Sequence, residues 1–243
     1  MNEFSLVTIS SSILTCVQPL PLNAFSDLLF YVATREIVSL SYCDLTSTEI
    51  VAGTFTDTEI TEDELQYITL TGSIPNNLKT GNCFVIKLTD AHATEFYTNP
   101  FYYESDTVKT SLLEYGCDES QFGFEYGTTK AFPNKVRLKV LLQYPAFPQE
   151  EKIYIDGNGV RHLLYSKIDR EYNLQTEYFT VDMHEKIIIA LSHDTVKFNG
   201  LQLQKTGAYE INYENEDQLS CGTYIYQASA KLTKNTTLRN NNC

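Results

Sequence analysis

Residues 135–164 read KVRLKVLLQYPAFPQEEKIYIDGNGVRHLL, and this stretch decides the fold class. Its first ten residues alternate apolar side chains with polar ones such as Arg137 and Lys139, which is the two-residue period of a half-buried β-strand. The period predicts that both cations point to water from this strand. Pro145 and Pro148 then end the pairing, because proline has no N–H to donate to a neighbouring strand.

The second half of the same stretch predicts a β-hairpin. Two strand-like runs, 152–155 and 160–164, flank the sequence Asp156-Gly157-Asn158-Gly159, which supplies the positive φ angles that a tight connection needs. These four residues share letters with a calcium-binding loop. An EF-hand, however, places its glycine at loop position six and a glutamate at position twelve. The hairpin is therefore the favoured interpretation, and a bound ion is the alternative.

Alternating patterns of apolar and polar residues recur along most of the chain, and one segment has the pattern of a helix. Further strands are expected at 37–43, 67–72, 83–88 and 209–213, and Asn199-Gly200 marks the tip of another hairpin. Asp182 is expected to cap a helix that continues over residues 183–191.

These patterns predict a mainly β (α+β) protein with two β-sandwich-like domains and one notable helix near 182–192. Asn99-Pro100 favours an extended or turn geometry and is taken as the region of the domain boundary. The expected parts are an N-terminal antiparallel β domain at 1–95, a C-terminal β-rich domain with the helix at 108–234, and a polar C-terminal arm at 235–243.

Composition limits the partners. The 243 residues include 18 Lys and Arg against 31 Asp and Glu, for a formal net charge of −13, so a nucleic acid backbone would be repelled. The longest apolar run, 187–191, is much shorter than the roughly 20 residues of a membrane helix. The N-terminus has no Lys or Arg before its first apolar stretch, so no signal peptide is expected. We therefore expect that the protein binds no nucleic acid and does not associate with a membrane. We also expect that it is made in the cytoplasm.

The six cysteines are spaced too widely for a C-x-x-C motif. A zinc ribbon or a thioredoxin-like motif is therefore excluded, and a disulfide framework is not expected at this size and cysteine density. Reduced thiols that pack as small hydrophobic groups are the expected state.

One cluster of residues resembles a metal site: His184, Glu185, His193 and Asp194. A zinc peptidase helix holds two histidines one turn apart, whereas these two are nine residues apart, which is 900° of rotation at 100° per residue. One helix therefore cannot bring them together, and capping or packing is the favoured role. We expect no catalytic, cofactor-binding or metal-binding residues and no enzymatic activity, with a metal-dependent hydrolase that uses these four residues as an alternative.

A carbohydrate-binding β-sandwich is the other alternative. Such a module needs an exposed platform of aromatic rings, and Phe101-Tyr102-Tyr103 is the only sequence candidate. The competing interpretation is that these three rings are buried at the domain junction.

Several segments together resemble one group of proteins. They are residues 112–119, 122–126, 136–138, 153–154, 158–161, 176–179 and 184–194, the N-terminal segments 69–75 and 81–84, and an Asn-rich end with a terminal Cys. Their order is similar to that in uncharacterised virion proteins of tailed bacteriophages that infect gut Bacteroidetes, the crAss-like group included. The similarity covers about two thirds of the chain.

This resemblance implies a structural role in a tail, neck or baseplate. It further implies a cyclic homo-oligomer, other virion proteins as partners, no cofactor, and a place in the virion, which is assembled in the host bacterial cytoplasm. Ring subunits make head-to-tail contacts that close by rotation, and β-rich domains with edge strands suit such contacts.

Overall fold

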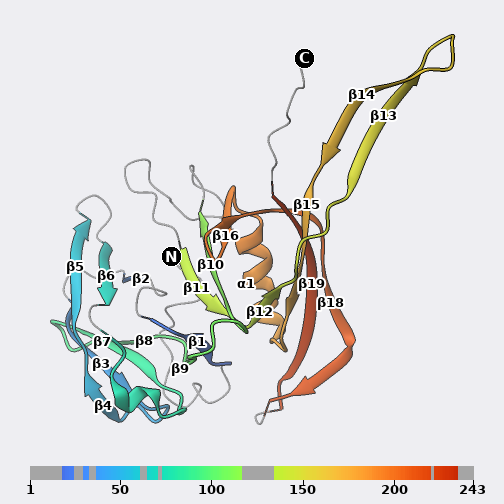
Figure 1. The fold of residues 1–243 in the computed structure, drawn as a ribbon. Coiled ribbons are helices and arrows are strands. Elements are labelled where there is room, and N and C mark those ends of the chain that lie inside the picture. Colours follow the sequence, from blue (N-terminus) through green and yellow to red (C-terminus); the bar gives the residue numbers. More distant parts are fainter. Residues whose placement is uncertain are drawn as a thin grey trace.

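The computed structural model describes residues 18–24, 30–32, 37–60, 65–70, 73–116, 134–219 and 222–234. Within them the chain is mainly β with one α-helix, as predicted (Figure 1). The polar C-terminal arm at 235–243 lies outside the described residues. Of the cysteines, Cys43 and Cys83 are free thiols, and the other four also lie outside the described residues.

The N-terminal part contains two antiparallel sheets. The first has the strand order β4-β3-β7-β8 and the second the order β2-β6-β5. The first sheet is formed by β3 (Ile37–Cys43), β4 (Glu49–Ala52), β7 (Val85–Asp90) and β8 (Glu95–Tyr97). The second is formed by β2 (Phe30–Val32), β5 (Phe55–Ile60) and β6 (Leu65–Leu70), and a 3-10 turn, η3 (Asn76–Lys79), follows it. The predicted strands at 37–43, 67–72 and 83–88 correspond to β3, β6 and β7.

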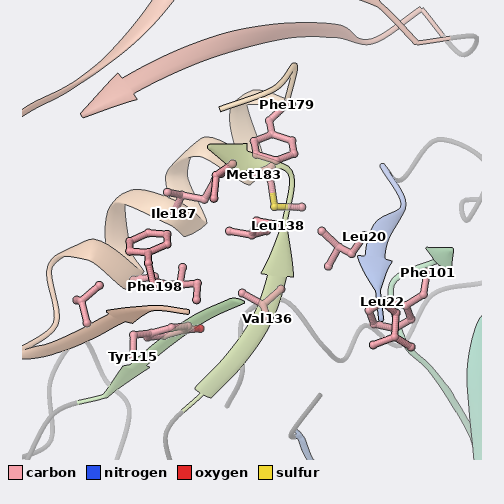
Figure 2. Close-up of a cluster of buried hydrophobic side chains, with 14 of the residues drawn as sticks. Leu20, Leu22, Phe101, Tyr115, Val136, Leu138, Phe179, Met183, Ile187 and Phe198 are labelled. Atoms are coloured by element: carbon pink, nitrogen blue, oxygen red, sulfur yellow. The ribbon is translucent and has the colours of Figure 1, made fainter. Parts of the chain in front are cut away.

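A short parallel pair joins this part to the remainder. β1 (Leu20–Leu22) pairs with β9 (Phe101–Tyr103). Leu20, Leu22 and Phe101 are buried in a hydrophobic cluster that also contains residues of the C-terminal part, Leu138 among them (Figure 2). The core is therefore continuous through this pair.

The C-terminal part contains two four-stranded sheets with the helix between them (Figure 1). The first sheet, in the order β11-β10-β16-β17, is formed by β10 (Ser111–Gly116), β11 (Asn134–Leu138), β16 (Thr195–Phe198) and β17 (Leu201–Gln202). The second, in the order β12-β15-β19-β18, is formed by β12 (Val140–Leu142), β15 (Arg170–Thr176), β18 (Gln204–Gln218) and β19 (Tyr224–Lys234). The helix is α1 (Val181–Leu191), and its Met183 and Ile187 point toward Leu138 in Figure 2.

The strand predicted from residue 135 onward is two strands. β11 ends at Leu138 and β12 begins at Val140, so the chain passes from one sheet to the other at Lys139. The prediction that Arg137 faces water is wrong. Its side chain is only 8% exposed, and its Nη1 donates a hydrogen bond to Thr110 Oγ1 at 3.2 Å. Both sides of this strand are covered because it lies beside the passage between two sheets.

The helix was predicted correctly, but its cap was not. Thr180, not Asp182, is the N-cap, and its Oγ1 accepts a hydrogen bond from the Met183 N–H at 3.3 Å. Asp182 lies in the first turn of the helix, where its negative charge interacts favourably with the helix dipole. Its carboxylate also forms an ion pair with Lys186 at 3.0 Å.

Thr180→Ala is therefore expected to lower the free energy of unfolding by about 1 kcal/mol, because the Met183 N–H loses its acceptor. Asp182→Asn is expected to lower the free energy of unfolding by only a few tenths of a kcal/mol, since the ion pair between Asp182 and Lys186 is exposed to solvent. Urea denaturation of both variants measures the difference. A larger loss for Asp182→Asn would contradict the assignment of Thr180 as the cap.

Candidate functional site

His184 is a completely buried packing residue. Its Nε2 lies 2.9 Å from the backbone oxygen of Tyr226 and its Nδ1 lies 2.7 Å from the hydroxyl oxygen of Tyr209. A carbonyl oxygen can only accept, so Nε2 carries the proton and Nδ1 accepts the hydrogen bond from the Tyr209 hydroxyl. Both ring nitrogens are therefore occupied by the protein itself.

The other three residues of the proposed metal cluster do not join His184. His193 Nδ1 lies 2.8 Å from the carbonyl oxygen of Ile189, and its ring packs against that of Tyr115 with the centroids 4.9 Å apart. Glu185 and Asp194 are exposed. Across the part of the chain that the structure describes, no three His, Cys, Asp or Glu side chains gather as metal ligands would.

Burial gives His184 a testable effect on stability. Desolvation holds the pKa of its imidazole below the ordinary value, and the hydrogen bond to the Tyr226 carbonyl opposes this only in part. The unfolded chain therefore binds a proton at a higher pH than the folded chain, so the stabilising contribution is complete above about pH 6.5 and is lost as the pH falls.

We expect the free energy of unfolding of the unmodified chain to fall more between about pH 7.5 and about pH 5.5 than that of His184→Asn, which has no group titrating there. Because other groups also titrate in this range, the measured quantity is the difference between the two proteins. An equal fall in both would contradict the account of His184.

The aromatic residues considered as a carbohydrate platform are buried or half-buried. Phe101 is buried on β9, and Tyr102 and Tyr103 are half-buried. Lys139 Nζ lies 5.1 Å from the centre of the Tyr102 ring, and Lys79 Nζ lies 5.5 Å from that of Tyr103. The three residues thus form part of the junction that β1 and β9 make.

The feature that stands apart from the rest of the fold is a hairpin that extends well beyond the body (Figure 1). It consists of β13 (Gln149–Ile155), the turn 156–160 and β14 (Arg161–Ile168), and we call residues 149–168 the projecting hairpin. Its two strands pair only with each other among the described strands. The hairpin predicted from the sequence at 152–164 is confirmed and is longer than expected.

The Asp156 carboxylate forms its hydrogen bonds with groups of the hairpin turn. Asp156 Oδ1 accepts hydrogen bonds from the backbone N–H groups of Asn158 and Val160, both at 2.9 Å. Its Oδ2 lies 3.0 Å from His162 Nε2, and Gly159 has a φ of 78°. The carboxylate therefore stabilises the hairpin turn, as the favoured interpretation required.

Exposed apolar side chains concentrate on the projecting hairpin and on its root, by which we mean residues 144–148 and 169–171. Of the fifteen large hydrophobic side chains exposed among the described residues, nine lie between 144 and 168. They are Tyr144, Phe147, Ile153, Tyr154, Ile155, Val160, Leu163, Leu164 and Ile168. Scattered exposed hydrophobic residues are ordinary, but a contiguous group is typical of an interaction site.

The register of the hairpin assigns these side chains to its faces. Ile153 is opposite Leu163, so these two and Ile155 share one face near the tip. Tyr154 is opposite His162 on the other face, with the ring centroids 6.1 Å apart. Both faces therefore carry side chains that favour burial.

The root of the hairpin is well anchored. Ala146 and Glu171 exchange two backbone hydrogen bonds, at 2.8 and 3.0 Å, and the Asp169 N–H donates to the Pro148 carbonyl at 3.1 Å. The Arg170 guanidinium lies 5.8 Å from the centre of the Phe147 ring. These contacts hold β14 as an extension of β15, so the hairpin has a defined direction.

A free two-stranded hairpin is at best marginally stable in water. The seven residues of β13, at about 3.3 Å per residue, give this hairpin a length of roughly 23 Å. Its fixed root and exposed apolar faces are suited to a partner that covers them. The candidate functional site is thus the exposed apolar surface of the projecting hairpin.

The chain matches no protein-family model, and the searches of curated proteins and of solved structures found no match. Among the described residues, no helix is both long enough and apolar enough to span a membrane.

Proposed function

We propose that the chain is a non-enzymatic structural subunit of a bacteriophage tail, neck or baseplate, which assembles through protein–protein contacts into a ring. The observation that carries the assembly part of this proposal is the projecting hairpin, whose apolar side chains Ile153, Ile155 and Leu163 are exposed in the single chain. The resemblance of the sequence to virion proteins supports the viral part.

The energetics favour a partner for the hairpin. Burying one large aliphatic side chain contributes about 1.5–3 kcal/mol, and a few such residues account for most of the affinity of an ordinary interface. Three of them on one face of a preorganised hairpin form the centre of such an interface. Because the hairpin lies at one end of the subunit, it is suited to a head-to-tail contact, which closes into a ring when the rotation between neighbours allows it.

The packing roles of the histidines also support a non-enzymatic protein. The two buried imidazoles, His184 and His193, are held by backbone carbonyl groups and by neighbouring rings. Of the four residues considered for metal chemistry, the two histidines thus serve the core, whereas Glu185 and Asp194 are exposed.

Quantitative mass spectrometry of purified tailed particles from the source culture tests the viral role. The proposal predicts that this chain is present at a fixed multiple of the portal subunit. Absence from particles, together with abundance in the cell extract, would overturn it and would favour a binding or enzymatic role in the host cell.

A further inference from the structure

Both outer edges of the projecting hairpin are unpaired within the described part of the chain. β13 and β14 pair with each other and with no other described strand. An unpaired edge presents N–H and C=O groups to any strand that comes alongside, and proteins usually protect it with proline, charge or a covering segment. Residues 153–155 read Ile-Tyr-Ile and extend beyond the body of the subunit (Figure 1), so this part of the β13 edge has none of these protections among the described residues.

The hydrogen bonds of the hairpin determine which backbone groups point outward. The Asp156 N–H donates to the Val160 carbonyl at 3.0 Å, so these groups point into the hairpin. Because this direction alternates along an antiparallel pair, every second residue, beginning with the next pair, points its N–H and C=O groups outward. The four outward residues are Ile153 and Ile155 on β13 and Arg161 and Leu163 on β14.

The charges of the two strands favour contact between unlike edges. β13 carries two acids and one base, whereas β14 carries two bases and no acid. These residues are Glu150, Glu151 and Lys152 on β13 and Arg161 and Lys167 on β14. Two β14 strands side by side therefore bring like charges together, whereas β14 beside β13 of another copy brings opposite charges together. The favoured contact is of head-to-tail type, because its two edges differ.

The pairs that hold the hairpin together recur when β14 lies beside β13 of another copy. Within the hairpin, Ile153 is opposite Leu163, and Glu150 is opposite Lys167 on the other face. Copies related by rotation about one axis lie at the same height, so the same residues come opposite each other between neighbours. Leu163 then packs beside the next copy's Ile153. Lys167, which also forms an ion pair with Asp169, lies opposite the next copy's Glu150.

We infer that β14 of one copy pairs antiparallel with β13 of the next copy, with Leu163 opposite the next copy's Ile153. This inference rests on the proposed assembly function and names the contact that joins the copies. Both residues point their backbone groups outward, so they can exchange two hydrogen bonds. Each hairpin then binds one neighbour on each edge, and closure into a ring leaves no edge of the hairpin unpaired.

A proline at an outward position tests this pairing. Proline has no N–H, and it is tolerated on an edge strand where that N–H would face solvent, so Arg161→Pro is expected to leave the hairpin of the single chain intact. Between copies it leaves the facing carbonyl of the next copy's Ile155 without its hydrogen bond. Arg161→Pro is therefore expected to weaken self-association at least about tenfold more than Arg161→Ala, which removes the same side chain and keeps the N–H. Sedimentation velocity on the full chain measures both variants.

Equal association of the two Arg161 variants would overturn the pairing inference, while association of the unmodified chain would still support the proposed function. If the unmodified chain does not associate at any concentration, both are overturned. A second experiment decides the question if Arg161→Pro unfolds the hairpin.

Mixed cysteine variants test the register without proline. One copy carries Tyr154→Cys and the other His162→Cys, and the two are mixed under mild oxidation. In the inferred register these positions face each other between copies as a non-hydrogen-bonded pair, whose Cα separation of about 4.5 Å suits a disulfide. The disulfide that joins positions 154 and 162 of different chains is expected to exceed the 154–154 and 162–162 products together. Peptide mapping of the linked chains measures the three products.

The matched control is Glu185→Cys mixed with His162→Cys, since both side chains are exposed and Glu185 lies on α1, away from the hairpin. Its yield gives the background from random encounters. If the associated chains give the 154–162 product only at that background, or mainly the 154–154 or 162–162 product, the pairing inference is overturned and the assembly proposal remains.

Discussion

The double variant Ile153→Asp, Leu163→Asp is expected to lose self-association by about a hundredfold or more. The two side chains lie opposite each other on one face of the projecting hairpin and are 47% and 60% exposed in the single chain. Each contributes about 1.5–3 kcal/mol when covered by a partner, and 1.4 kcal/mol corresponds to a tenfold change in affinity. Sedimentation velocity over a wide range of concentrations measures the loss.

The matched control is Val38→Asp with Val108→Asp. Both valines are more exposed than Ile153 and lie away from the hairpin, on β3 and in the loop before β10. The same number of acidic charges is added, so a general effect of charge on solubility or association appears in both variants. An equal loss in the control would contradict the role of the hairpin.

His184→Ala is expected to lower the free energy of unfolding by about 3 kcal/mol. The substitution removes a completely buried ring, and the Tyr209 hydroxyl loses the acceptor of its hydrogen bond. The Tyr226 carbonyl oxygen still accepts a hydrogen bond from the Phe179 N–H at 2.8 Å. A buried polar group left without a hydrogen bond costs about 1–3 kcal/mol, and the cavity adds to this. Urea denaturation at neutral pH measures the change.

His162 provides the control for that experiment. It is exposed on the projecting hairpin and interacts only with the turn residue Asp156 and the ring of Tyr154. His162→Ala is expected to change the free energy of unfolding by less than about 0.5 kcal/mol. If His162→Ala lowered the free energy of unfolding as much as His184→Ala, the burial of His184 would not explain the loss.

Local sequence patterns were sufficient to predict the class of fold and two of its hairpins. The Asn199-Gly200 pair was expected at a hairpin tip, and both residues have positive φ angles of 50° and 79° between β16 and β17. The turn at Asp156 and the helix over residues 183–191 were predicted for the same reason, because turn chemistry and the apolar pattern of a helix depend on only a few neighbouring residues. The cap itself was assigned to Asp182 and is Thr180.

Features that depend on tertiary packing were not predictable in this way. The two-residue period correctly described β11, but it carried no information on the second layer that buries Arg137 beside Thr110. Similarly, the change of sheet at Lys139 depends on which distant strands pair with β11 and β12.

The candidate site was predicted in part. The hairpin was expected, but the exposure of both its faces was not, because alternation normally implies one buried face. A signal was present in the run Ile153-Tyr154-Ile155, where three consecutive large side chains place apolar surface on both faces. The residues considered as a metal site are near one another only in sequence. His184 and His193 are buried at separate places, and Glu185 and Asp194 are exposed.

Native mass spectrometry of the intact, unmodified chain tests whether the projecting hairpin joins identical subunits. We expect a closed assembly whose mass is one integer multiple of 27.7 kDa, with few open intermediates, because a head-to-tail contact that closes leaves no free hairpin. A chain that remains monomeric at every concentration would contradict the claim that the projecting hairpin exists to join identical subunits.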